Sequence, residues 1–70
     1  MTKWQFKEYL KQHGYSVDED ANYPTILMVG ASSDEIKKKF FEVKLLAQKV
    51  GYNHTIGVKN LEEENEGINS

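Results

Sequence analysis

The chain has 70 residues, no cysteine, and nine lysines against eleven acidic residues. A chain of this length forms one domain with a small core, because it buries only about 60% of its unfolded surface. The lack of cysteine excludes disulfides and thiolate metal sites. The lack of arginine disfavours bidentate contacts to phosphates and bases, which suit the guanidinium group.

Charge and hydropathy divide the chain into two parts. Residues 1–59 carry all the lysines and seven of the acids, whereas residues 60–70 carry four acids and no lysine. We therefore predict one α/β domain over 1–59 and a flexible acidic tail over 60–70. No apolar run approaches the roughly 20 residues of a membrane-spanning helix, and no signal-peptide pattern opens the chain. Together with the lack of cysteine, this predicts a soluble cytoplasmic protein.

The first predicted helix follows Met1. Thr2 and Gln5 have the spacing of a capping box, and Gly14 supplies a stop signal. Its apolar face consists of Phe6, Tyr9, Leu10 and His13. Trp4 projects from the far side of this helix, near lysines spaced four residues apart that predict a solvated face: Lys3, Lys7 and Lys11. The tryptophan either lies along the surface beside the chain end or anchors a partner.

Three stretches have strand patterns. Residues 15–18 predict a short strand. Residues 25–29 (TILMV) are apolar on both sides, which is typical of a central strand with both faces covered. Residues 52–59 (YNHTIGVK) alternate between apolar and polar side chains, which predicts a half-buried strand.

The longest periodic segment is the helix predicted between Ser32 and Gly51. Ser32 and Glu35 have the capping-box spacing, and Gly51 is placed to end the helix in the left-handed conformation. Its core stripe consists of Ile36, Phe40, Val43, Ala47 and Val50, with Leu46 at the edge.

Phe41 and Leu45 lie one turn apart on nearly the opposite side of this helix. A helix that lies on one sheet needs only one apolar face, so this second ridge is surplus. One explanation is that the first helix, the tail or lysine stems cover it. The other is that it forms a subunit or partner contact.

The order of elements predicts an α+β fold of two layers, α-β-β-α-β, with both helices on one face of a three-stranded mixed sheet. The first two strands would form an antiparallel hairpin. A right-handed crossover through the long helix would place the third strand parallel to the second, which then lies in the middle. The alternative places the first strand in the middle.

No motif supports catalysis, a cofactor or a metal. Gly30–Ser33 joins a strand to a helix start but lacks the spacing of phosphate-binding loops, so a capped helix start is favoured. Asp18, Asp20 and Asn22 begin like a calcium loop, yet the required glycine and final acid are missing, which favours a solvated turn. We predict no catalytic, cofactor or metal residues and no enzyme activity.

The two histidines, His13 and His54, each lie at the edge of a predicted apolar face, where a lone histidine usually packs. A metal site would need both of them plus carboxylates, and no spacing brings these together.

The leading functional hypothesis is a non-catalytic interaction module with no membrane or small-molecule ligand. It would self-associate, as in a homodimer, or bind a host protein through Trp4, Phe41 and Leu45. A small domain without arginine, cysteine or catalytic signature suits an accessory or inhibitor protein of a phage or mobile element.

Two alternatives remain open. Lysines of both helices, including Lys37–Lys39, would bind nucleic acid, although three consecutive helical residues spread over about 300° and favour a solvated helix start. An acidic surface would instead imitate nucleic acid and occupy a basic DNA-binding protein. Its candidate residues flank the central strand at a separation of about 17 Å: Asp18, Glu19, Asp20, Asp34 and Glu35.

Overall fold

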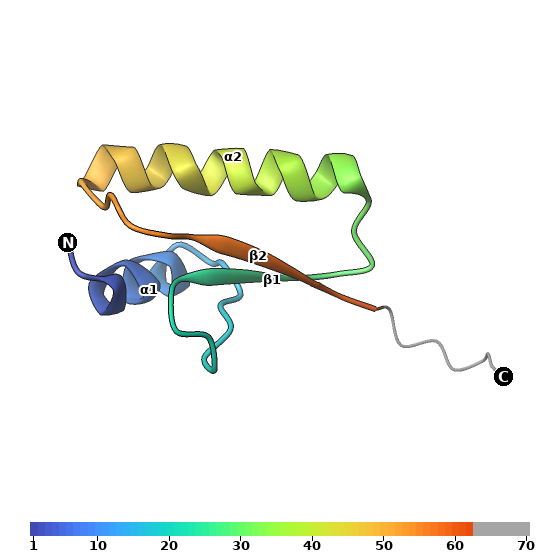
Figure 1. Ribbon diagram of the computed structural model, residues 1–70, viewed down its shortest axis with the longest axis horizontal. Helices are drawn as coiled ribbons and strands as arrows, with labels where there is room; N and C mark the ends of the chain where they lie inside the picture. Colours follow the sequence, from blue (N-terminus) through green and yellow to red (C-terminus); the bar gives the residue numbers. More distant parts are fainter. Residues whose placement is uncertain (63–70) are drawn as a thin grey trace, which may run out of the picture.

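The computed structural model describes residues 1–62 and contains two helices and two strands. In chain order these are α1 (Lys3–Gln12), β1 (Thr25–Val29), α2 (Ser33–Val50) and β2 (Gly57–Leu61). α2 runs antiparallel to both strands, and α1 lies at the end of the sheet where the strands begin and α2 finishes (Figure 1). Neither helix in this part of the chain is long and apolar enough to cross a membrane.

Both predicted capping boxes are confirmed. The Thr2 hydroxyl accepts from the Gln5 amide at 3.1 Å, and the Gln5 side chain accepts from the Thr2 amide at 2.8 Å. The Ser32 hydroxyl accepts from the Glu35 amide at 3.2 Å, and the Glu35 carboxylate accepts from the Ser32 amide at 2.8 Å. Gly51 ends α2 with φ of 80°, in the left-handed region that favours glycine.

The predicted three-stranded mixed sheet is wrong: the described chain forms one sheet of two parallel strands. The parallel pairing of the second and third predicted strands is present as β1 and β2. The first predicted strand, residues 15–18, contributes only a single antiparallel bridge between Val17 and Ile26. Two backbone bonds flank this bridge, Leu27 N–H to Ser16 C=O at 2.8 Å and Asp18 N–H to Thr25 C=O at 2.9 Å.

Local bonds at both ends of residues 15–18 explain why the strand stays short. The Tyr15 amide donates to the Leu10 carbonyl at 3.0 Å, which ends α1, and the Tyr15 hydroxyl donates to the Glu42 carboxylate on α2. The Asp18 carboxylate accepts from the Asp20 amide at 3.0 Å and turns the chain. Only the middle of the segment is left to pair with β1.

The third predicted strand, residues 52–59, begins and ends later in the chain than predicted, at Gly57 and Leu61. Residues 52–56 form a loop, although their alternation resembles that of a strand. The Tyr52 amide donates to the Ala47 carbonyl at 2.8 Å, and its hydroxyl donates to the Thr55 carbonyl at 2.8 Å. The buried Tyr52 ring stacks on Phe6 with the ring centroids 4.6 Å apart. Tyr52 is therefore part of the helix ending, and β2 begins only at Gly57.

β2 extends into the stretch that was predicted as tail. The Asn60 side chain accepts from the Ala31 amide and donates to the Ala31 carbonyl, both at 3.0 Å. The Gly30 amide donates to the Leu61 carbonyl at 2.9 Å. These bonds join the end of β2 to the start of α2, and the rest of the predicted tail, residues 63–70, lies outside the described residues.

One apolar core joins the helices to the sheet. Its buried members among the described residues are Phe6, Leu10, Val17, Ile26, Val43, Ala47 and Tyr52. Because strand side chains alternate, Ile26 and Met28 point to this core and Leu27 and Val29 point to the opposite face of the sheet. On α2 the core side centres on Val43 and Ala47, and Phe40 lies at its margin.

Leu10 and Leu45 provide a test of this assignment, because Leu10 is 0% exposed and Leu45 is 54% exposed. We expect Leu10→Ala to reduce the free energy of unfolding by about 2–5 kcal/mol, since it leaves a cavity in the core. Leu45→Ala makes the same chemical change on the surface and should change that free energy by no more than about 0.5 kcal/mol. Urea denaturation of dilute protein measures both, and equal effects would contradict the assignment.

Tyr15 predicts a dependence of stability on alkaline pH. Burial, then the hydrogen bond to Glu42, raise the pKa of Tyr15 from 10.0 to about 12. The unfolded state therefore loses this proton first, so the Tyr15 contribution is complete below pH 10 and is lost as the pH rises toward about 12.

We expect the free energy of unfolding of Tyr15→Phe to fall less steeply than that of the wild type across this pH interval. Tyr23→Phe changes an exposed tyrosine and should follow the wild type. Denaturant unfolding at a series of pH values measures the slopes, and parallel curves for wild type and Tyr15→Phe would show that Tyr15 does not cause the alkaline loss of stability.

Candidate functional site

The outer face of α2 carries an exposed apolar ridge. Phe41 is 65% exposed and Leu45 is 54% exposed, and both lie opposite Val43 and Ala47, which are buried. We call Phe41 and Leu45 the α2 outer ridge. α1 does not cover it, because α1 packs at the opposite side of the core through Phe6 and Leu10.

Charged side chains border the α2 outer ridge. Asp34 lies in the first turn of α2 and Lys49 in the last turn, and both are exposed. Lys38 is exposed on the same side of the helix, one turn from Phe41. The ridge is therefore an apolar centre with an acid toward one end of the helix and a base toward the other.

Trp4 lies on α1, a different helix from the one that carries the α2 outer ridge. The indole is 60% exposed, and two ammonium groups lie over it, with Lys3 Nζ 5.4 Å and Lys7 Nζ 4.9 Å from the ring centroid. Lys7 itself is only 3% exposed, so the predicted solvated lysine row does not hold at this residue. Trp4 remains a predicted partner contact.

The acidic residues predicted as one surface are largely engaged in local contacts. Glu19 lies 2.5 Å from Lys11 Nζ, and Glu8 lies 3.2 Å from the same nitrogen. These hydrogen bonds raise the pKa of Lys11, and the bond to Lys11 lowers the pKa of Glu19. Asp18 pairs with Lys59 at 3.8 Å.

The remaining three acids lie at opposite ends of β1. Asp20 follows Asp18 in the turn before β1, whereas Asp34 and Glu35 lie in the first turn of α2, and Glu35 caps that helix. Three of the five predicted acids, Asp18, Glu19 and Glu35, thus contact a lysine or a backbone amide, and the acidic surface remains a prediction.

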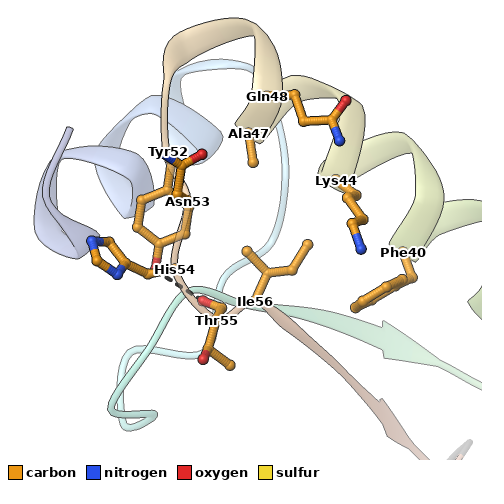
Figure 2. A pocket seen from close by; sticks show the side chains of 9 residues that line it. All are labelled: Phe40, Lys44, Ala47, Gln48, Tyr52, Asn53, His54, Thr55 and Ile56. Carbon is orange, nitrogen blue, oxygen red and sulfur yellow. Dashed lines mark hydrogen bonds between the residues drawn. The ribbon is translucent and has the colours of Figure 1, made fainter.

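A groove that the sequence analysis missed opens along one flank of α2 (Figure 2). Its volume is about 390 Å³. It is lined by Phe40, Lys44, Ala47, Gln48, Tyr52, Asn53, His54, Thr55 and Ile56. The Lys44 side chain extends toward the groove beside the Phe40 ring, with Ile56 across from them (Figure 2). The sequence contains one feature that could have indicated this groove: Phe40 and Lys44 lie one turn apart at the margin of the core stripe.

The two histidines of the chain are engaged in local contacts. The His54 ring packs against Tyr52, with centroids 5.4 Å apart, and points away from Lys44 (Figure 2). His13 Nδ1–H donates to the Tyr9 carbonyl at 2.9 Å. Within residues 1–62, no three histidine, aspartate or glutamate side chains are grouped as metal ligands would be. The arrangement is suited to binding through apolar contact and charge.

Comparison of the chain with models of protein families, with curated proteins and with solved structures finds no match. The α2 outer ridge and the groove are therefore the features of this chain that indicate a function.

Proposed function

We propose that this chain is a non-catalytic protein-interaction module that self-associates through the α2 outer ridge. The observation that carries the proposal is the exposure of Phe41 and Leu45, one turn apart on the helix face opposite the core. Contiguous exposed apolar side chains of this size tend to mark protein contacts. Burial of the ridge against a second copy removes both side chains from water.

Charge along α2 favours a second copy as the partner. Two α2 helices that pack antiparallel around a two-fold axis make the same contact twice. If the axis passes between residues 41 and 42, Asp34 of one chain lies opposite Lys49 of the other, and the two Phe41 side chains meet at the axis. Leu45 then lies opposite Lys38, whose aliphatic stem can cover it. A single register therefore pairs the opposite charges and also brings the apolar side chains into contact.

The small core provides a further argument for association. The core cluster has seven buried side chains, and the described residues contain neither cysteine nor a cluster of metal ligands to reinforce it. Small domains without such reinforcement gain stability from surface that they bury in oligomers. Nucleic-acid binding has less support, because Lys11 is paired with two carboxylates and Lys7 is buried.

Loss of the apolar ridge should produce a monomer. In sedimentation equilibrium we expect a wild-type dimer and a monomeric Phe41→Glu/Leu45→Glu variant, because two carboxylates cannot be buried in an apolar contact without a large desolvation cost. Trp4→Ser removes a comparably exposed aromatic side chain from α1 and should leave the dimer unchanged. A wild-type monomer at high concentration, or a dimer that persists after the double substitution, would contradict the proposal.

The register predicts a charge-swap rescue. Asp34→Lys should weaken the dimer by about three- to thirty-fold, since two symmetric ion pairs of up to about 1 kcal/mol each are lost. Asp34→Lys/Lys49→Asp should restore most of the affinity, although it places unfavourable charges at both ends of the helix dipole. Lys49→Asp alone serves as the second single variant. Equal weakening in the double variant would exclude this register.

A further inference from the structure

The outer edge of β2 has backbone groups available for pairing. Within residues 1–62, β2 pairs only with β1. The Gly57 amide donates to the Pro24 carbonyl at 2.9 Å, which directs Gly57 toward β1. Because backbone groups of successive strand residues point to alternate sides, Val58 and Asn60 direct their N–H and C=O groups to the outer edge.

The groove lies on the β2 side of α2. One flank of α2 carries Lys39 and Glu42, which line a hollow together with Met28 and Val29 of β1. The opposite flank carries Phe40 and Lys44, which line the groove together with Ile56, the residue just before β2. The groove therefore reaches the residue just before β2, and the edge of β2 that faces away from β1 is unpaired within residues 1–62.

We infer that this groove binds an extended segment of a partner protein, which adds to the outer edge of β2 as a third strand. Addition of a strand to an exposed sheet edge obtains affinity from backbone hydrogen bonds and specificity from alternate side chains. Apolar surface from Phe40 and Ile56 lies beside the ammonium group of Lys44 in the groove. The segment therefore presents an apolar side chain and an acidic side chain on one face.

The spacing of the groove residues sets the sequence pattern. Phe40 and Lys44 are separated by about 6 Å along the helix axis, at about 1.5 Å per residue. Two residues of a strand advance about 6.8 Å, so side chains two positions apart match this separation. An antiparallel segment is slightly more stable than a parallel one, and it runs in the same direction as α2, meeting Phe40 before Lys44. The pattern is apolar, any residue, then acidic.

This site is independent of the proposed dimer contact. Phe41 and Leu45 point away from the core, whereas the groove lies between α2 and the loop before β2. The Phe41→Glu/Leu45→Glu variant therefore retains the groove, and failure of one proposal can be distinguished from failure of the other.

The probe is the capped peptide acetyl-Ser-Thr-Val-Thr-Glu-Thr-Ser-amide, titrated into the ¹⁵N-labelled full chain, both as the wild type and as the Phe41→Glu/Leu45→Glu variant. We expect the amide signals of Val58 and Asn60 to shift and their hydrogen exchange to slow, while the Lys59 amide, which faces β1, changes less. N-methylation of the peptide valine or glutamate should abolish binding, because these amides face β2. N-methylation of the threonine between them should not.

Charge reversal tests the role of Lys44. Lys44→Glu should weaken binding of the peptide by about threefold or more, and replacement of the peptide glutamate by lysine should restore binding to this variant. In the Phe41→Glu/Leu45→Glu background, where the proposed dimer contact is absent, Lys38→Glu makes the same charge change away from the groove and should leave the peptide affinity unchanged. Protection of the Val58 and Asn60 amides before peptide is added would show an edge that is already occupied. That result, the absence of binding, or binding that tolerates every N-methyl group would overturn the inference.

Discussion

The stack of Tyr52 on Phe6 determines how the chain is arranged around it. The ring centroids lie 4.6 Å apart and both side chains are buried, so the contact joins α1 to the end of α2. The left-handed turn at Gly51 and the bond from the Tyr52 amide to Ala47 place the ring there. The five residues that follow α2 and Gly51 are used for this anchor and its loop, and β2 starts only at Gly57.

The sheet beneath α2 is narrow. The sheet has two strands, and residues 15–18 add only one bridge because Tyr15 and Asp18 are held by local contacts. α2 therefore buries one side against the core and leaves the other side, with Phe41 and Leu45, in solvent. The two-stranded sheet also leaves the outer edge of β2 without a partner strand within residues 1–62.

Many of the charged side chains are engaged within the chain. Lys11 and Lys59 pair with acids of the α1–β1 connection, and Glu35 caps α2. These contacts engage charges that a nucleic-acid surface or its mimic would need. The two proposals instead use Lys44 at the groove and the charges of Asp34 and Lys49 at the two ends of α2.

The sequence by itself determined both helices, because their signals act over a few residues: Thr2 with Gln5, Ser32 with Glu35, and glycine where the chain turns left-handed. It also identified the second apolar side of α2, since helical periodicity fixes which side chains share a face. Only the tertiary structure decided the number of strands and the groove. Alternation over residues 52–59 is compatible with a strand or a loop. Contacts with residues far away in the sequence decide between them: Tyr52 stacks on Phe6 in the loop, and Asn60 bonds to Ala31 in the strand.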